Sequence, residues 1–117
     1  MRKLFVLLAL LTAASQTQAE LGFTTLTATT TSQTLTFSPA KSDVGICNYG
    51  AVIVYFRLFW EDETPAAATS AHNAIPAGSA TAPYCVGVGD AGTTPAPWKH
   101  LTYISASSTA TVTVTSE

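Results

Sequence analysis

The sequence predicts an all-β protein, namely a single antiparallel β-sandwich of about seven strands, Ig-like or jelly-roll-like, after a cleavable signal peptide. Apolar and polar residues alternate with a period of two along much of the chain, as they do in half-buried strands. Gly-, Pro-, Asn- and Ser-containing turns separate these runs, and β-branched and aromatic residues dominate them. We therefore expect residues 1–19 to be the signal peptide and residues 20–117 to form the domain.

The first 19 residues have the three parts of a secretory signal. A basic start, Arg2-Lys3, precedes an unbroken apolar run over residues 4–11, and small and polar residues lead to Ala19. The run is shorter than the about 20 residues that a membrane-spanning helix needs. We expect cleavage after Ala19, a secreted, periplasmic or cell-surface location, and no stable membrane span in the mature form. A retained anchor or a buried N-terminal segment is the alternative.

Four strands are expected in the first half of the domain, at residues 24–31, 33–37, 43–48 and 51–60. In the fourth, every even-numbered residue from Val52 to Trp60 is large and apolar, which predicts that this set faces the core. The tripeptide Asn48-Tyr49-Gly50 is expected to form a short hairpin connection in which Gly50 takes a positive φ.

Three further strands are expected at residues 80–86, 98–105 and 109–115. A Pro-Ala-Gly turn at residues 76–78 precedes the first of them, and two serines at residues 107–108 join the last two. The segments 61–73 and 87–97 are expected to be long loops.

Cys47 and Cys85 are the only cysteines. In an exported protein such a pair is expected to form a disulfide, worth about 4 kcal/mol in the chain-entropy model. Two buried free thiols are the alternative. No Cys-x-x-Cys spacing or paired histidine indicates a metal site.

Removal of the signal peptide leaves three basic residues, Lys41, Arg57 and Lys99, against seven acidic residues, a net charge of −4. No basic stripe remains to neutralise phosphates, so we expect no nucleic-acid partner and no binding to an anionic membrane surface.

No pattern in the sequence indicates catalysis, a cofactor or a metal. The acidic run at residues 61–63 lacks the spacing of a calcium loop and is expected to be solvated. His72 and His100 have no nucleophile or metal-ligand motif beside them, and His100 is expected at the surface. We therefore expect a protein that is not an enzyme.

Two sets of residues are candidates for binding. Arg57 lies in mid-strand between Tyr55 and Phe59, where it could pair with an acidic residue, stack on the rings or lie in an interface. Trp98 and Tyr103 could form an exposed aromatic platform for a glycan, whereas Trp60 is expected in the core.

Several segments of the domain carry a resemblance to a known group of proteins. They are Thr27-Ala28-Thr29, Gln33-Thr34-Leu35-Thr36-Phe37, Ile46-Cys47-Asn48-Tyr49-Gly50, Val54-Tyr55-Phe56-Arg57-Leu58, Ile75-Pro76-Ala77-Gly78-Ser79, Leu101-Thr102-Tyr103-Ile104-Ser105-Ala106 and Thr109-Ala110-Thr111-Val112-Thr113-Val114. In this order they resemble the small phage virion-associated β-sandwich proteins of head, decoration and tail-fibre contexts. The resemblance implies a structural or assembly role without catalytic residues. The signal peptide departs from that group and favours a prophage-derived or bacterial exported protein.

Three functions follow as hypotheses. The first is a structural or adhesive subunit of a fibre or filament, which self-associates or joins a larger protein assembly. The second is a small carbohydrate-binding module, which requires an exposed Trp98. The third is a secreted inhibitor, which requires a rigid protruding loop.

Overall fold

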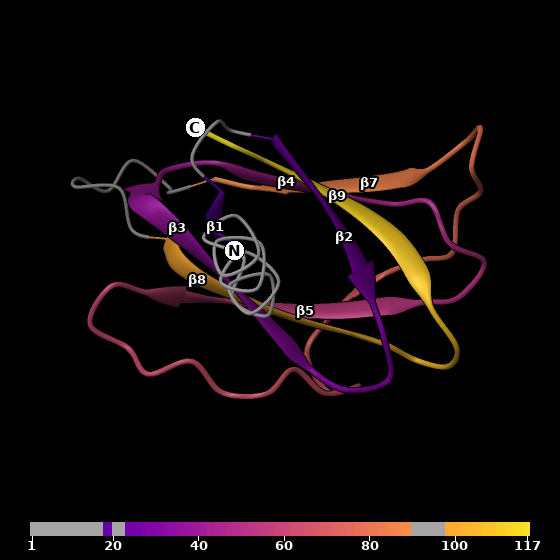
Figure 1. Ribbon diagram of the computed structural model, residues 1–117, viewed down its shortest axis with the longest axis horizontal. Coiled ribbons are helices and arrows are strands. Elements are labelled where there is room, and N and C mark those ends of the chain that lie inside the picture. The colour runs from indigo at the N-terminus through magenta and orange to yellow at the C-terminus, as the bar shows by residue number, and fades with distance from the viewer. Residues whose placement is uncertain (1–17, 20–22, 90–97) are drawn as a thin grey trace, which may run out of the picture.

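The protein is a sandwich of two β-sheets, described by a computed structural model for residues 18–19, 23–89 and 98–117 (Figure 1). Nine strands are present in this part of the chain: β1 (Gln18–Ala19), β2 (Phe23–Ala28), β3 (Gln33–Lys41), β4 (Val44–Asn48), β5 (Val54–Trp60), β6 (Asn73–Ile75), β7 (Tyr84–Val88), β8 (Trp98–Ser105) and β9 (Ala110–Ser116). Sheet A has the order β1-β3-β8-β5-β6 and sheet B the order β2-β9-β4-β7. Among the described residues no helix is long and apolar enough to cross a membrane.

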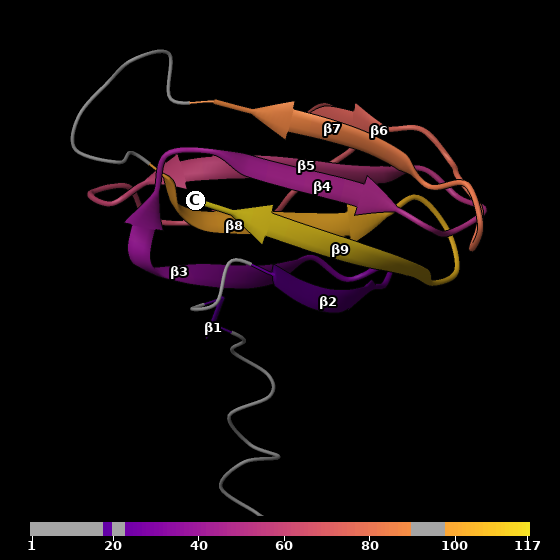
Figure 2. The ribbon, with the colours of Figure 1, turned by 90° about the horizontal axis from the view of Figure 1, so that it is seen from above.

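The strands from β2 to β9 are paired as in a long hairpin that has been rolled up. The antiparallel pairs are nested, with β2 against β9, β3 against β8, β4 against β7 and β5 against β6. Two further antiparallel pairs, β4 with β9 and β5 with β8, join the halves into two sheets, and Figure 2 shows β2, β9, β4 and β7 of sheet B stacked in this order. This is the jelly-roll arrangement. It confirms the predicted antiparallel sandwich.

The core lies between the sheets and follows the period-two pattern of the sequence. Leu35 and Phe37 of β3 are fully buried, as are Val112 and Val114 of β9. The polar residues between them lie on the outer faces, because successive side chains of a strand point to opposite sides. The predicted strands at 43–48, 98–105 and 109–115 recur within one residue of their limits, and the strand predicted at 33–37 continues to Lys41.

The tripeptide Asn48-Tyr49-Gly50 does not form the hairpin that we expected. β4 belongs to sheet B and β5 to sheet A, so this segment begins a crossing between the sheets. Gly50 does not have the positive φ that we expected. A glycine is needed at this position for another reason: a Cβ atom at residue 50 would collide with the side chain of Ala110.

Asn48 is the polar centre of this crossing. Its side chain is fully buried, and its Nδ2 donates to the carbonyl oxygens of Val52 (2.8 Å), Pro76 (3.1 Å) and Ile75 (3.4 Å). Its Oδ1 accepts from the Gly50 N–H at 2.9 Å. One amide therefore holds the β4–β5 connection against the chain that follows β6.

The prediction that Trp60 lies in the core is wrong: Trp60 is the last residue of β5 and lies beside a bulge in β8. Phe59 pairs with His100 but Trp60 pairs with Trp98, which leaves Lys99 as an extra residue in β8. Trp60 is 47% exposed at the margin of the sheet, where its ring lies edge-to-face with that of Trp98 at 6.3 Å. Phe59, expected on the mixed face, is only 2% exposed.

Residues 61–72 explain why Phe59 is buried on the outer face of sheet A. This segment leaves β5 and reaches the start of β3, where the Ala68 N–H donates to Ser32 Oγ at 2.9 Å. Because β8 separates β5 from β3, the segment crosses the outer face of sheet A, and Figure 1 shows it running along the side away from sheet B. Ala68 and Thr102 are almost fully buried with Phe59. We call residues 61–72 the strap.

β7 begins later than the strand predicted at residues 80–86. A turn occupies residues 79–82, in which the Ser79 N–H donates to the Ala82 carbonyl and the Ala82 N–H donates to Ser79 Oγ. The long loop predicted at 87–97 falls mostly at residues 90–97, outside the described residues. The same holds for the predicted signal peptide except Gln18 and Ala19, which pair with β3 as the parallel strand β1.

Candidate functional site

The predicted interface residues Tyr55, Arg57 and Phe59 lie together on the outer face of sheet A. The Arg57 guanidinium stacks over the Phe59 ring at 4.8 Å from its centroid, and its NH1 atom lies 3.5 Å from His72 Nε2 in the strap. No acidic side chain of the described residues pairs with Arg57. Phe59 therefore has little free surface to offer a partner, whereas Tyr55 and Arg57 remain partly exposed.

The predicted aromatic platform of Trp98 and Tyr103 is not formed. Tyr103 faces the core and is 4% exposed, and this burial raises the pKa of its phenol. Trp98 is partly buried and packs against the same core. The position of Tyr103 on the inner face of β8 follows from its pairing with Phe56 and Gln33, which the sequence alone does not specify.

The predicted disulfide between Cys47 and Cys85 is present, with its sulfur atoms 2.08 Å apart. The two residues are directly paired across β4 and β7, and both lie on the outer face of sheet B. The bond thus ties the edge strand β7 to β4 and does not join the two sheets. Cys85 is exposed.

The described charged residues form no recognisable catalytic or metal centre. No group of three or more His, Cys, Asp or Glu side chains comes together in residues 18–19, 23–89 and 98–117. The acidic run at 61–63 is exposed, as expected. His100 is partly buried, with its Nδ1 3.2 Å from Thr36 Oγ1; burial, and then the charge of Lys99, lower its pKa.

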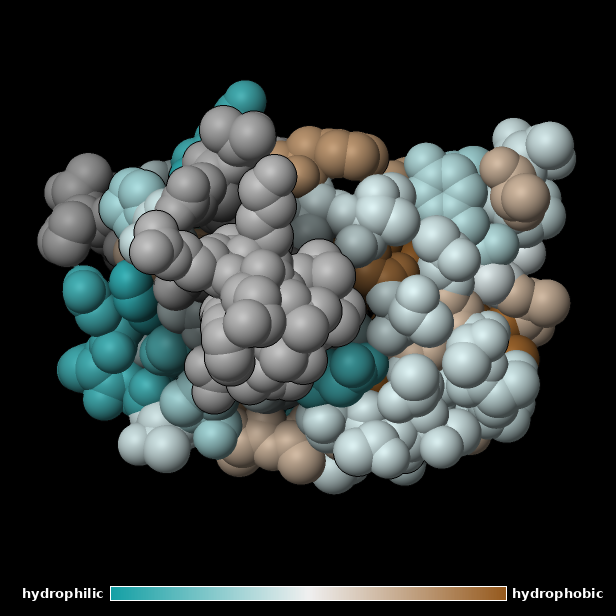
Figure 3. Space-filling model, viewed as in Figure 1, coloured by the Kyte–Doolittle hydropathy of each residue, from teal (hydrophilic) through white to brown (hydrophobic). Residues whose placement is uncertain are grey.

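The surface of sheet B is unusual because its four strands, β2, β4, β7 and β9, lack charged residues. On the side of the molecule shown in Figure 3, strongly hydrophilic side chains gather mainly toward one end, and most of the other coloured side chains are intermediate in hydropathy. The outer face of sheet B consists of threonines, glycines, the disulfide and Phe23, which is 59% exposed.

Both edges of sheet B are open in the described part of the chain. β2 pairs only with β9, and β7 pairs only with β4. Soluble proteins usually protect such edges with Lys, Pro, a bulge or a very short strand. β2 has six residues and β7 has five, and neither has a charge, a proline or a register shift. Sheet A ends instead on strands of two and three residues.

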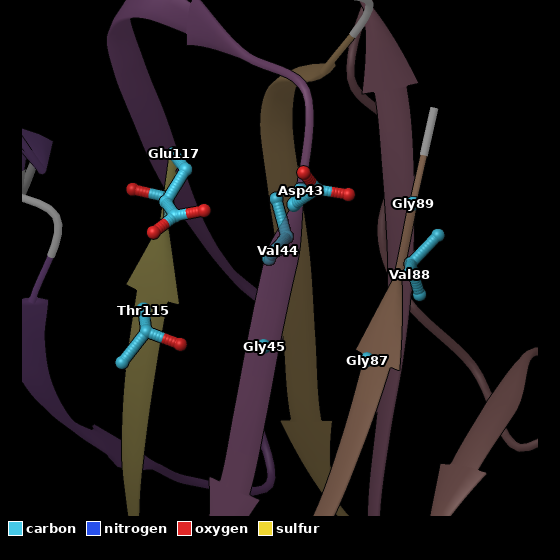
Figure 4. A pocket seen from close by; sticks show the side chains of 9 residues that line it. Asp43, Val44, Gly45, Gly87, Val88, Gly89, Thr115 and Glu117 are labelled. Atoms are coloured by element: carbon cyan, nitrogen blue, oxygen red, sulfur yellow. The ribbon is translucent and has the colours of Figure 1, made fainter. Parts of the chain in front are cut away.

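A hollow of about 590 Å³ lies on sheet B beside the edge strand β7 (Figure 4). Gly45, Gly87 and Thr115 lie side by side on three neighbouring strands and form part of its lining, and Asp43 and Glu117 lie beside each other, two residues along the chain from Gly45 and Thr115 respectively. A Cβ atom at residue 45 would meet Thr115 Oγ1 at 2.6 Å, whereas one at residue 87 would meet nothing within 4 Å. The open part of the hollow is therefore over Gly87, at the edge.

Sequence reasoning did not single out Phe23, Gly87 or the two open edges. The available signal was the lack of charged residues in the segments 23–28, 44–48, 84–88 and 110–116. No protein-family model matches the chain, and no curated protein is similar to it. The function is therefore inferred from the chain's own residues.

Proposed function

We propose that this chain is an exported, non-enzymatic structural subunit that self-associates or joins a larger protein assembly. The observation that carries the proposal is the pair of unprotected edge strands, β2 and β7, on the uncharged sheet B. Unpaired N–H and C=O groups along such an edge bind another extended strand by main-chain hydrogen bonds. A chain that must remain monomeric at high concentration would be expected to carry a charge or a proline there.

Export is supported by two independent features. The disulfide requires an oxidising compartment to form and persist. The N-terminal sequence has the basic, apolar and small-residue parts of a secretory signal. The jelly-roll arrangement adds weaker support, since it recurs in viral capsid domains, in keeping with the resemblance to virion proteins, although a fold alone does not determine function.

The proposal is tested by light scattering on the oxidised protein, purified after expression with its own leader. We expect intact mass to place the N-terminus at Glu20, and the average mass in solution to increase with protein concentration. A constant monomer mass over the whole concentration range would contradict self-association, and retention of residues 1–19 would contradict export by this leader.

Carbohydrate binding is the second candidate, and the exposed ring of Trp60 favours it in place of the predicted platform. Trp60 is 47% exposed, and the exposed carboxylates of residues 61–63 follow it directly. Jelly-roll domains also occur among lectins. A glycan array with the wild type and Trp60→Ala would test this function: binding that depends on Trp60 supports it, and no binding contradicts it.

A further inference from the structure

We propose that the partner of β7 is β2 of a second copy of this chain, so that copies add head to tail into an open filament with one continuous sheet B. This inference rests on the proposed self-association and names the surfaces that carry it. Four properties of the described strands support it: strand direction, residue register, shape at the junction and twist.

Strand direction allows the junction without any rearrangement. All neighbours in sheet B are antiparallel, and the sheet has four strands in the order β2-β9-β4-β7. With an even number of alternating strands, β2 and β7 run in opposite directions. A copy repeated along the sheet therefore places its β2 antiparallel to β7 of the previous copy, and the alternation continues across the junction.

The register follows from the rows of the sheet. Phe23 pairs with Thr115, Thr115 with Gly45, and Gly45 with Gly87, so these four residues lie in one row across the four strands. Continuing this row into the next copy places its Phe23 opposite Gly87.

The two residues that meet in this register are complementary in shape. Phe23 is 59% exposed, and Gly87 has no heavy atom within 4 Å of where its Cβ would lie. Gly87 also borders the hollow beside β7 (Figure 4). An aromatic ring that covers a glycine on the neighbouring strand is a known means of stabilising a β-pair. The Phe23 ring of the next copy would fill the open part of the hollow.

Symmetric pairing of β7 with β7, or of β2 with β2, lacks this fit. A β7–β7 pair leaves Phe23 exposed on both copies, and a β2–β2 pair leaves Gly87 uncovered on both. The edges of sheet A are less suited to pairing: β6 has three residues, and β3, which becomes an edge when cleavage after Ala19 removes β1, carries Pro39 and Lys41. The head-to-tail junction covers both the Phe23 ring and Gly87.

The twist of the sheet determines the kind of assembly. Adjacent strands rotate by roughly 20–25° about the direction in which strands are added, so four strands rotate each copy by about 80–100°. Rotation and translation then share one axis, which generates a helix and not a closed ring. We expect open filaments with about four copies per turn.

The test is site-directed cross-linking of the mature protein, exported with its own leader and purified as above. Phe23→Cys, Gly87→Cys and the double variant are oxidised mildly, separated on non-reducing gels and mapped by peptide mass spectrometry. The open space at residue 87 accommodates the new side chain. The junction predicts a ladder of covalent oligomers joined by a 23–87 bond in the double variant alone, with the native 47–85 bond intact.

Each of the other possible outcomes contradicts a different part of the proposal. Covalent dimers from either single variant would indicate symmetric pairing, β2 with β2 or β7 with β7, and would overturn the head-to-tail junction. Oligomers in light scattering without a 23–87 bond would overturn the junction and leave the proposed self-association standing. A monomer in both measurements would overturn both.

A substitution that introduces no cysteine gives an independent test of the junction between β2 and β7. Phe23→Ala removes the ring that covers Gly87 and should weaken self-association about tenfold, in the range of aromatic residues at interfaces. Trp60→Ala is the matched control, since Trp60 is also an exposed aromatic residue but lies in sheet A, away from both edges of sheet B. Equal effects of the two substitutions would contradict the junction.

Discussion

Replacement of Asn48 tests most sharply how this sandwich is held together. Asn48 is fully buried, and its amide joins the β4–β5 crossing to the chain after β6 through Val52, Ile75 and Pro76. An amide has two N–H donors, so the three donated contacts amount to two full hydrogen bonds; the Gly50 N–H supplies a third to Oδ1. Asn48→Ala removes all of them and leaves buried backbone groups without partners.

The expected cost follows from these three bonds. At about 1 kcal/mol each, they account for a loss of about 3 kcal/mol in the free energy of unfolding, and unsatisfied groups add to this. A loss of this size lowers the melting temperature of a domain of this length by about 12–24 °C. Asn48→Asp should be at least as costly at neutral pH, because a carboxylate keeps the shape but faces three carbonyl oxygens without a proton to donate.

The assay is urea denaturation followed by circular dichroism, together with thermal melting. Asn73→Ala is the matched control, since Asn73 is exposed and its loss should change the free energy of unfolding by less than about 0.5 kcal/mol. Equal stabilities of Asn48→Ala and Asn73→Ala would refute the role assigned to the buried amide.

Four further predictions concern the bulge, the disulfide and the two titrating groups Tyr103 and His100. Phe59→Ala should cost about 3 kcal/mol in unfolding free energy because Phe59 is buried under the strap, whereas Trp60→Ala should cost less than about 1 kcal/mol; the reverse order would contradict the bulge. Reduction of the disulfide should lower the free energy of unfolding by about 2–4 kcal/mol and increase amide exchange first in β7, and uniform exchange would argue against its role at this edge. Burial raises the pKa of Tyr103, so folding favours the neutral phenol, and the free energy of unfolding should fall as the pH rises above about 10. Tyr103→Phe should remove the last step of the absorbance titration at 295 nm. The lowered pKa of His100 has the opposite consequence, a loss of stability as the pH falls below about 6.5, and an NMR titration of His100 with a midpoint at or above that value would contradict it.

The alternation of apolar and polar residues was sufficient to predict the sandwich and most of its strands. The strand predicted at residues 98–105 is β8 with the same limits, because its ends coincide with local turn residues. The disulfide was also predictable, since only two cysteines are present. These features depend on local sequence or on composition.

The sequence-based predictions were wrong at positions whose environment is determined by parts of the chain that are distant in sequence. Trp60 and Phe59 exchanged their expected environments because a bulge in β8 and a covering strap are not encoded in β5 itself. Asn48-Tyr49-Gly50 has the composition of a hairpin turn, but the rolled topology requires a crossing between sheets at that point. Tyr103 was assigned to a ligand platform because the face on which it lies depends on the pairing of β8 with β3 and β5.

The open edges were not predictable as a pair, because their positions depend on the nesting of the strands. The sequence shows that residues 23–28 and 84–88 lack charge, but only the topology places both at the margins of one sheet. The same topology gives that sheet an even number of strands, on which the head-to-tail junction depends.

Sedimentation velocity of the oxidised mature protein, from roughly 1 μM to 1 mM, tests the central claim most directly, because this range covers the affinities of reversible self-association. We predict a sedimentation coefficient that rises with concentration, without a plateau at the dimer, as copies add through β2 and β7. A single monomeric boundary at every concentration would contradict the claim that this protein is an assembly subunit.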